Sequence, residues 1–432
     1  MASQVPVRTV AQRPTRVRWW VIVFAVALAV ITYIDRVSIS FAAPFIQHDL
    51  GLSPEQMGWA FFAFGWAYAL FEIPSGYLGD WIGPRKVLTR IVVWWSFFTA
   101  ATGWAWSLTS LLTTRFLFGI GEAGCFPNLT KAFTTWLPEK ERVRAQGITW
   151  LSARWGGAFT PLLVAQVMGL VGWRHSFEIF GCLGVVWAVV FVCWYRDNPL
   201  QNPRLNAGER ELLRHGATLA AGHGDVPWGR LVRSRQVWML CWQYFCLSYG
   251  WYFYVTWLPT YLREGRHQEI GSAALLSVLP LFCGGLGNPA SVLVTARLAR
   301  RTGVARARRM MAYAGFAGAS LFLLLSTRVH DPLLAMLAIG AASFANDLVM
   351  PGAWGAAMDI GGQYAGTVSG AMNTWGNVGG AIAPLANGYI LTWTAGNWDL
   401  TFYVSAAIYL AGVVCWMFLD PVTPLAEESS PH

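Results

Sequence analysis

The sequence is poor in charge, and this excludes an ordinary soluble protein. Only 12% of its 432 residues are Asp, Glu, Lys or Arg, about half the share found in soluble globular domains. Apolar residues take their place: 55% of the chain is hydrophobic and 15% aromatic, with 25 Trp and 44 Gly. Interfacial tryptophan and packing glycine are both typical of membrane proteins. At roughly 20 apolar residues per span, the chain accommodates about a dozen helices.

Two other scarcities argue against a metal or redox centre. The seven cysteines lie in or at the ends of apolar segments, form no CxxC motif and are odd in number, which favours free thiols. No histidine falls inside a predicted span, so neither a histidine proton relay nor an intramembrane metal site is expected. We expect no cofactor and no metal. The net charge of +9 is spread over short clusters, so no nucleic-acid partner is expected.

The apolar runs predict an all-α membrane protein with twelve transmembrane helices. The basic N-terminal segment lacks a small-residue cleavage site, so it is expected to remain in the mature protein. The expected spans are residues 19–44, 57–78, 91–111, 113–136, 147–171, 177–195, 237–262, 272–296, 310–327, 333–357, 365–391 and 400–419.

One long loop, rich in Pro and Gly, separates six spans from six. The pattern GGAxxPL occurs at residues 156–162 and again at 379–385, an offset of 223 residues. Two pseudo-symmetric six-helix halves explain the repeat. The expected division is an N-terminal tail (1–18), a first half (19–195), a linker (196–236), a second half (237–419) and a C-terminal tail (420–432).

Basic residues are concentrated on one side of this topology. Of the 31 Lys and Arg residues, 23 lie in the N-terminal tail or in the segments 85–90, 140–144, 196–235 and 297–309. Positively charged loops face the cytoplasm. Both termini are therefore expected in the cytoplasm. The chain is expected in a cell membrane, and the bacterial inner membrane is favoured. We expect a monomer.

A few ionisable residues fall inside the predicted spans, where a charge is costly and marks a functional site by default. Asp35 and Arg36 lie in span one, and Arg115 and Glu122 lie on nearly one face of span four. Two explanations stay open: a proton and substrate pathway, which we favour, or paired charges that only hold helices together. Proton transfer needs a carboxylate that can change protonation, and Asp35 and Glu122 are the candidates. Arg36 stays charged and offers a planar fork to an anion.

Further polar residues extend the candidate pocket. Arg154 in span five is either a second anion-binding charge or an arginine that reaches toward the membrane interface. Trp354 lies in span ten, and Asn373 and Asn377 present two amides on one face of span eleven. These amides bind either a sugar-acid oxygen or a neighbouring helix. For the span-seven residues Tyr249, Tyr252 and Tyr254, plain packing is slightly favoured.

An acidic residue near a basic loop suggests a gate at the end of span two. Charges at helix ends stabilise one conformation of a helical bundle, so this group is assigned to gating. The four candidates are Glu72, Asp80, Arg85 and Lys86. The roles of Asp347, on span ten, and Asp359, after it, stay open, with a helix-end charge as the interpretation considered for either.

Taken together, these segments resemble the anion:cation symporters of the major facilitator superfamily. The similarity covers nearly the whole chain, and it implies the major facilitator fold with proton-driven import of an organic anion such as a hexonate, hexuronate or glucarate. The matching segments are residues 33–44 (YIDRVSISFAAP), 71–86 (FEIPSGYLGDWIGPRK), 115–128 (RFLFGIGEAGCFPN) and 366–384 (GTVSGAMNTWGNVGGAIAP).

The resemblance also implies individual roles. Asp35 and Glu122 would couple protons, and Arg115 would adjust Glu122. The residues that it places at the substrate are Tyr33, Arg36, Tyr68, Trp354 and Asn373.

Two positions depart from the family pattern. Trp81 stands where the loop motif usually has a basic residue, which puts the strength of the gate in question. Arg154 stands where sugar-acid carriers are expected to have a neutral polar group, which points to a substrate with an additional negative charge or to a different anion.

The expected function is therefore proton-coupled import of an organic anion by alternating access. Export or anion exchange by the same fold stays open, because gradients and not the fold set the direction. A non-transporting nutrient sensor is a more distant alternative. No enzyme is expected, since no nucleophile, metal cluster or cofactor motif occurs in a suitable context.

Overall fold

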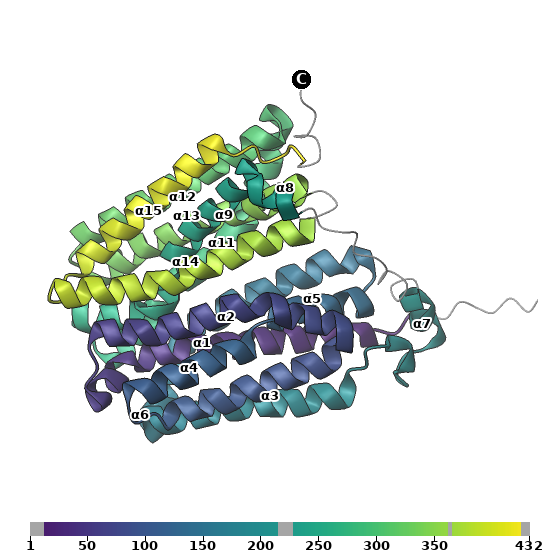
Figure 1. Ribbon diagram of the computed structural model, residues 1–432, viewed down its shortest axis with the longest axis horizontal. Coiled ribbons are helices and arrows are strands. Elements are labelled where there is room, and N and C mark those ends of the chain that lie inside the picture. The colour runs from purple at the N-terminus through teal and green to yellow at the C-terminus, as the bar shows by residue number, and fades with distance from the viewer. Residues whose placement is uncertain (1–12, 215–227, 362–364, 425–432) are drawn as a thin grey trace, which may run out of the picture.

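The computed structural model describes residues 13–214, 228–361 and 365–424, and every regular element in these ranges is a helix. Figure 1 shows two groups of long helices side by side, the first half in purple to blue and the second in green to yellow. This arrangement confirms the predicted all-α fold of two halves.

Each predicted span overlaps at least one helix. After η1 (Val17–Trp19), the first half contains α1 (Trp20–Leu50), α2 (Pro54–Ile82), α3 (Pro84–Gly103), α4 (Leu108–Glu122), α5 (Cys125–Trp136) and α6 (Glu139–Trp194). The connection carries η2 (Pro199–Gln201), α7 (Ala207–Arg214) and α8 (Trp228–Arg233). The second half contains α9 (Arg235–Thr256), α10 (Leu258–Thr260), η3 (Tyr261–Gly265), α11 (Ile270–Thr302), α12 (Val304–Arg328), α13 (Pro332–Gly361), α14 (Ala365–Trp393) and α15 (Trp398–Phe418).

The turn between the third and fourth spans was placed wrongly, near residue 112. The structure places it at residues 104–107, because α3 ends at Gly103 and Ser107 caps α4. The Ser107 hydroxyl accepts a hydrogen bond from the Ser110 N–H at 3.2 Å, and the Ser110 hydroxyl accepts one from the Ser107 N–H at 3.0 Å. Such a reciprocal cap satisfies N–H groups that a helix start otherwise leaves free.

Two glycines interrupt helices, one inside a predicted span and one in the predicted break between spans five and six. Gly124 (φ 82°) separates α4 from α5 inside the predicted fourth span. Gly172 (φ 76°) is a non-helical residue inside α6, which holds both the fifth and the sixth span. Glycine adopts positive φ without the steric penalty of a Cβ atom.

The packing of the repeated GGAxxPL segments supports duplication of the halves. A Cβ atom on Gly157 of α6 would lie 2.8 Å from the Tyr33 ring of α1. At the matching position of the second half, a Cβ on Gly380 of α14 would lie 2.3 Å from the Tyr252 ring of α9. The same glycine therefore receives the same kind of side chain in each half.

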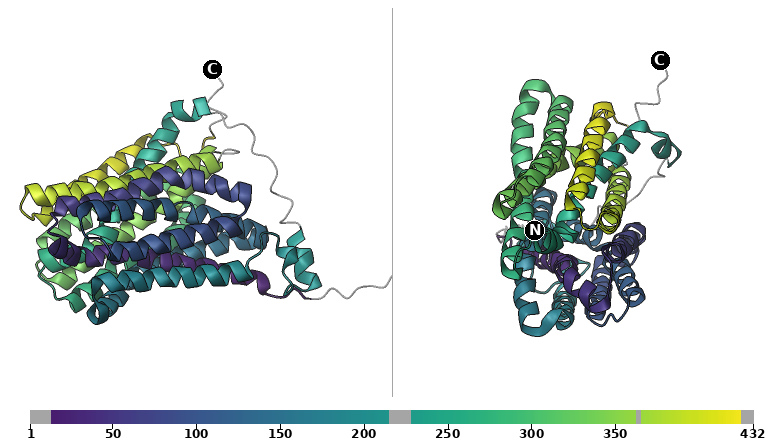
Figure 2. Two further views of the ribbon diagram at one scale, coloured as in Figure 1. Left: turned by 60° about the horizontal axis from the view of Figure 1, so that its bottom comes forward. Right: turned by 90° about the vertical axis from the view of Figure 1, so that its left-hand side faces the viewer.

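The two halves contact each other mainly through α2 with α14 and α6 with α11 (Figure 2). Small residues bring α2 and α14 close together, as is common between membrane helices. A Cβ on Gly65 would lie 2.9 Å from the Ala381 Cβ, and one on Gly388 would lie 2.6 Å from the Pro54 carbonyl oxygen. These contacts run from the middle of α2 to its start.

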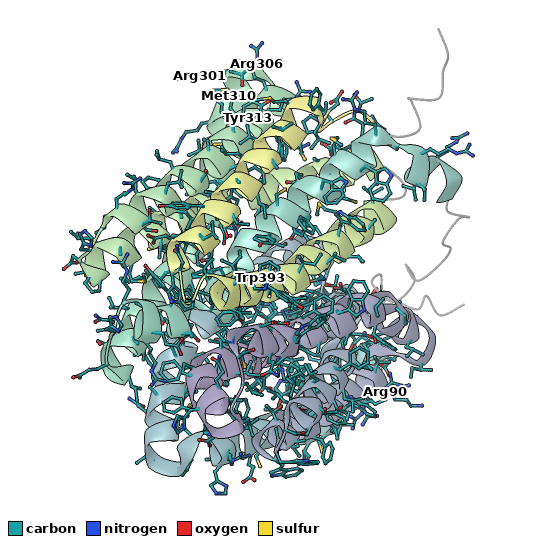
Figure 3. The ribbon with its side chains drawn as sticks, turned by 60° about the vertical axis from the view of Figure 1, so that its left-hand side comes forward. Arg90, Arg301, Arg306, Met310, Tyr313 and Trp393 are labelled. Atoms are coloured by element: carbon teal, nitrogen blue, oxygen red, sulfur yellow. The ribbon has the colours of Figure 1, made fainter. Side chains whose placement is uncertain are left out.

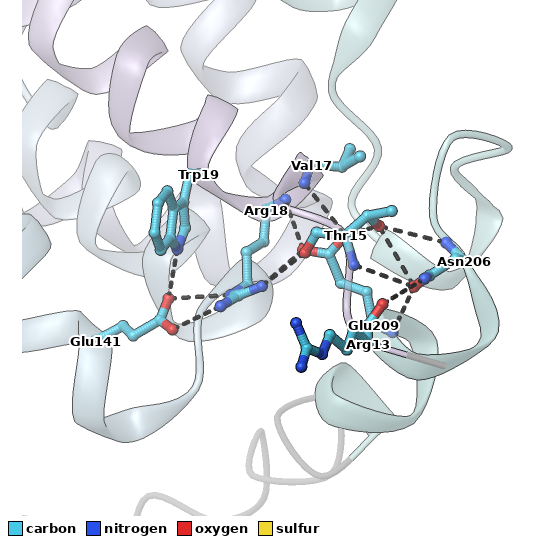
Figure 4. Close-up of polar contacts among 8 residues, drawn as sticks. All are labelled: Arg13, Thr15, Val17, Arg18, Trp19, Glu141, Asn206 and Glu209. Carbon is cyan, nitrogen blue, oxygen red and sulfur yellow. Dashed lines mark hydrogen bonds and ion pairs between the residues drawn. The ribbon is translucent and has the colours of Figure 1, made fainter. Parts of the chain in front are cut away.

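A buried charge cluster attaches α7 to the first half, at what we call the linker end of the bundle (Figure 4). Arg18 donates to Glu141 at 2.8 Å and to Glu209 of α7 at 2.9 Å. The fully buried Glu209 carboxylate also accepts the backbone N–H groups of Val17 and Arg18 at 3.2 and 3.1 Å. The entry to α1, the start of α6 and the connection are thereby joined.

Replacement of Glu209 by Ala is expected to lower the free energy of unfolding by about 3 kcal/mol, because it leaves a buried guanidinium without one of its two partners. Thermal unfolding of the purified protein in detergent measures this change. The exposed Arg210→Ala variant on the same helix is the control, with an expected change within about 0.5 kcal/mol. Equal stability of the two variants would contradict the assignment.

Candidate functional site

An ion pair between α1 and α4 forms the centre of the first half. Arg36 Nε donates to Glu122 Oε1 at 2.5 Å, and the two side chains are 8% and 0% exposed. The structure thus brings together two residues that the sequence singled out from different spans. A charge-assisted hydrogen bond of this kind is strong when water is excluded.

Aromatic rings surround the Arg36 guanidinium. Its Cζ lies 4.7 Å from the Tyr68 ring centroid, 5.4 Å from that of Phe64 and 5.6 Å from that of Tyr33. Such rings attract a cation through their π-electron faces. Arg36 Nη2 has no hydrogen-bond partner among the described residues, so this donor is available to a ligand.

Asp35 and Arg115 complete a network of four charges. Asp35 is 1% exposed, lies near Trp95 and Thr99 of α3, and has no hydrogen-bond partner for either carboxylate oxygen in the described part of the chain. The Arg115 guanidinium lies 4.4 Å from the Phe118 ring centroid and interacts electrostatically with both carboxylates. Arg115 therefore acts on Glu122 through space.

A small central pocket lies between the halves. Its volume is about 10 Å³, the space of roughly one water molecule, so a sugar acid does not fit without movement of the halves. Of the predicted site residues, Arg36 and Arg115 line it. The other lining residues are Phe61, Phe64, Trp251, Tyr252, Val255, Thr256 and Pro384. Among the described residues, no group of three or more His, Cys, Asp and Glu could hold a metal ion.

A second buried ion pair joins the halves. Arg154 of α6 donates to Asp347 of α13 at 3.2 Å, and its Cζ lies 4.3 Å from the Trp251 ring centroid. Arg154 is 6% exposed and Asp347 is 0% exposed. The alternative that Arg154 extends to the membrane interface is therefore wrong. The interpretation of Asp347 as a helix-end charge is also wrong, because it lies in the middle of α13 with this arginine as partner.

Asp359 is a helix-end charge, as interpreted. It lies near the end of α13 and accepts a hydrogen bond from Arg308 of α12 at 2.6 Å. Its side chain is 44% exposed.

The predicted amide pair of α14 meets Glu72 of α2. Asn373 Nδ2 and Asn377 Nδ2 each donate to one Glu72 oxygen at 2.9 Å, which confirms that both amides share one face. Two partners were considered for these amides, a sugar-acid oxygen and a neighbouring helix. In the structure they bind the neighbouring helix, α2. Glu72, expected beside the basic loop, instead links the two halves, because it lies two to three helical turns before the end of α2.

Arg85 and Lys86, expected in a basic loop after α2, lie in the first turn of α3, because only Gly83 separates the two helices. The Arg85 backbone N–H donates to Asp197 Oδ1 at 2.9 Å, and its Nη2 donates to the Val192 carbonyl at 2.6 Å. Lys86 is exposed. The side chains of Asp80 and Trp81 lie outside the part that the structure describes.

Trp354 contacts its own half. Its indole N–H donates to the Tyr244 hydroxyl at 3.1 Å, and the two rings meet edge to face. Tyr244 in turn interacts electrostatically with Arg154, Asp347 and Glu72. Trp354 therefore holds a tyrosine that lies near the Arg154–Asp347 pair and near Glu72.

Sequence analysis missed Trp251 and favoured packing for Tyr252, yet both line the central pocket. For Tyr252 the structure supplies the pairing: it faces Gly380 as Tyr33 faces Gly157, whereas the two tyrosines are 219 residues apart and the repeated glycines 223. For Trp251 no comparable signal exists among the 25 tryptophans.

Comparison with known proteins agrees with this geometry. Residues 25–384 match the family model of the Major Facilitator Superfamily. The chain is 38% identical to the probable sulfoacetate transporter SauU of Cupriavidus necator, over 91% of each chain. It is 28% identical to the probable galactarate/D-glucarate transporter GudP of Escherichia coli, over 95% of each chain, and 29% identical to the hexuronate transporter of Bacillus subtilis, over 91% of this chain and 90% of that one.

Among solved structures, a bacterial homologue of the human lysosomal transporter Spinster, in an inward-facing and occupied conformation, superposes with a TM-score of 0.75. It shares 19% identity and covers 97% of this chain and 100% of its own, which shows a common fold. The chain therefore belongs to the Major Facilitator Superfamily, and its relatives there are anion transporters.

Proposed function

We propose that this chain is a proton-coupled symporter that imports an organic anion by alternating access, with a sugar acid of the hexonate, hexuronate or glucarate type as substrate. The observation that carries the proposal is the Arg36–Glu122 pair beside the central pocket. A fixed cation held by a titratable carboxylate can couple an anion to a proton.

The coupling follows from competition for one guanidinium. Ionised Glu122 occupies Arg36 Nε. A proton on Glu122 removes its negative charge and makes the guanidinium available to a substrate carboxylate. Substrate and proton then favour the same state of the protein, so each raises the affinity for the other.

Asp35 is the second proton-coupling acid in this proposal. Its carboxylate is buried on the α3 side of α1, and Arg115 interacts electrostatically with both Asp35 and Glu122. A change in the charge of one acid therefore alters the field at the other. In this mechanism both Asp35 and Glu122 can bind a proton.

Alternating access requires the two halves to separate first at one end and then at the other. In this proposal, the contacts of Glu72 with Asn373 and Asn377 break and reform in each cycle. The segment with Asp80, Arg85 and Lys86 belongs to the same gating region.

We place the linker end of the bundle in the cytoplasm of a bacterium, with the chain in its inner membrane. The Arg-rich turn between α11 and α12, where Figure 3 labels Arg301 and Arg306, adds to the positive charge predicted for that side. Both termini are cytoplasmic in this orientation.

Sulfoacetate is a second candidate substrate. The relative with 38% identity is named for sulfoacetate transport, whereas the named sugar-acid relatives share 28–29% identity. A planar carboxylate and a tetrahedral sulfonate each present at least two oxygens that an arginine fork can bind.

Glu122→Gln is expected to abolish accumulation driven by a pH gradient while counterflow of the substrate continues, because the amide cannot carry the proton. Uptake into liposomes that contain the purified protein measures this effect. In the native protein, each unit of pH gradient supports up to about tenfold accumulation per coupled proton. Glu269→Gln, in an exposed position, is the matched control. Full pH-driven uptake by Glu122→Gln would refute the role of Glu122.

Arg36→Ala is expected to weaken substrate binding by about tenfold to a hundredfold, the range of a lost charge-assisted hydrogen bond. Arg36→Lys keeps the charge but not the planar fork, so an intermediate affinity is expected. Equilibrium binding of labelled substrate to the protein in detergent compares the variants. An unchanged affinity in Arg36→Ala would exclude Arg36 from the substrate site.

A further inference from the structure

Arg154 is arranged in the same way as Arg36. Each guanidinium is buried, donates to a single carboxylate and lies against an aromatic ring. Each also keeps one terminal nitrogen without a hydrogen-bond partner among the described residues, Nη2 in Arg36 and Nη1 in Arg154. A buried guanidinium with an unused donor is ready to receive an anion.

The two guanidinium groups contact different members of one aromatic pair, Tyr33 and Trp251. Trp251 lines the central pocket together with Arg36 and also stacks under Arg154. The Tyr33 ring lies 6.2 Å from the Trp251 ring and 5.6 Å from Arg36 Cζ. Gly157, three residues after Arg154 and so on the same face of α6, packs directly on Tyr33. That face of α6 is therefore turned toward Tyr33 and Trp251, of which Trp251 lines the pocket.

The carboxylate that holds Arg154 is itself incompletely satisfied. Asp347 Oδ1 accepts hydrogen bonds from Arg154 at 3.2 Å and from Asn346 at 3.0 Å, whereas Oδ2 has no partner in the described ranges. A pair whose only purpose was to join the halves would be expected to use both oxygens and both terminal nitrogens. The single Arg154–Asp347 hydrogen bond is therefore a contact that a second anion can replace, with Arg154 Nη1 as a further donor.

We infer that the substrate of this transporter is a small dianion, with one anionic group bound by Arg36 and the other by Arg154. In the closed state Asp347 is paired with Arg154. Binding of the second anionic group to Arg154 breaks this pair. This inference rests on the proposed function, and it narrows the substrate class from organic anions to molecules with a carboxylate or sulfonate at each end.

The test compares pairs of compounds that differ in one charge. Glucarate and gluconate share one carbon skeleton but carry two charges and one, and sulfoacetate and ethanesulfonate form a shorter pair. Binding is measured by competition, and transport by counterflow without a pH gradient, so that proton coupling does not enter. The native protein is expected to bind the dianion of at least one pair about tenfold more tightly than its monoanion.

Two variants assign that preference to Arg154. The double variant Arg154→Gln with Asp347→Asn removes both charges together and so leaves no unpaired charge in the bundle; it is expected to bind dianion and monoanion about equally. Asp347→Asn alone frees Arg154 and is expected to keep or increase the preference for the dianion. The monoanion serves as the internal comparison, because the double variant is expected to change its affinity less than that of the dianion.

The remaining outcomes each contradict a specific statement. Gradient-driven uptake without preference for the dianion overturns this inference and leaves the symport proposal intact. If the double variant still prefers the dianion, Arg154 is excluded as the second anion site. If the double variant loses affinity for dianion and monoanion equally, the Arg154–Asp347 pair is a structural contact only. Binding of none of the four compounds overturns the inference and the proposed substrate class together.

Discussion

The cost of burying a charge among membrane helices is the constraint on which the rest of this structure depends. An ionised side chain in such surroundings needs a partner of opposite charge or a water-filled cavity. Here two buried arginines each meet a carboxylate from another helix, Arg36 with Glu122 and Arg154 with Asp347. These pairs favour particular helix faces at each contact. They also put ionisable groups near the place where the two halves meet.

The same constraint makes the site responsive. Loss of one partner of a buried ion pair leaves an uncompensated charge, so in the proposed mechanism protonation of Glu122 would favour entry of a substrate anion that pairs with Arg36 again. The pocket beside Arg36 has space for about one water molecule, and its walls come from both halves. Substrate binding and movement of the halves are therefore linked by geometry: the pocket enlarges only if the halves move apart.

Contacts between α2 of the first half and α14 of the second are of two physical kinds. Toward the start of α2, small residues allow backbone contact with α14, as at Gly65 and Ala381. Farther along α2, the contact is polar, between Glu72 and the amides of Asn373 and Asn377. Close packing of small residues depends little on protonation, whereas a carboxylate that accepts two amide hydrogens depends on its charge.

Much of the fold could be predicted because its signals are local. Hydropathy located the spans, and the GGAxxPL repeat identified two halves. Boundaries were wrong where a single residue outweighs hydropathy: the Ser107 cap ends an apolar run early, and Gly124 breaks one in the middle. Membrane-buried charge likewise singled out Arg36 and Glu122 as candidates, since any ionisable residue in a span is conspicuous.

The sequence by itself determined the all-helical fold, its division into halves and the identity of the buried arginines and carboxylates, because apolar length and charge in a span need no knowledge of distant residues. Tertiary structure alone decided the partners. Arg36 and Glu122 are 86 residues apart, and Arg154 and Asp347 are 193 apart. No spacing along one helix encodes such pairs, since they depend on how helices rotate and dock against one another. For that reason Asp347 was mistaken for a helix-end charge, and Glu72 was placed beside the wrong neighbours.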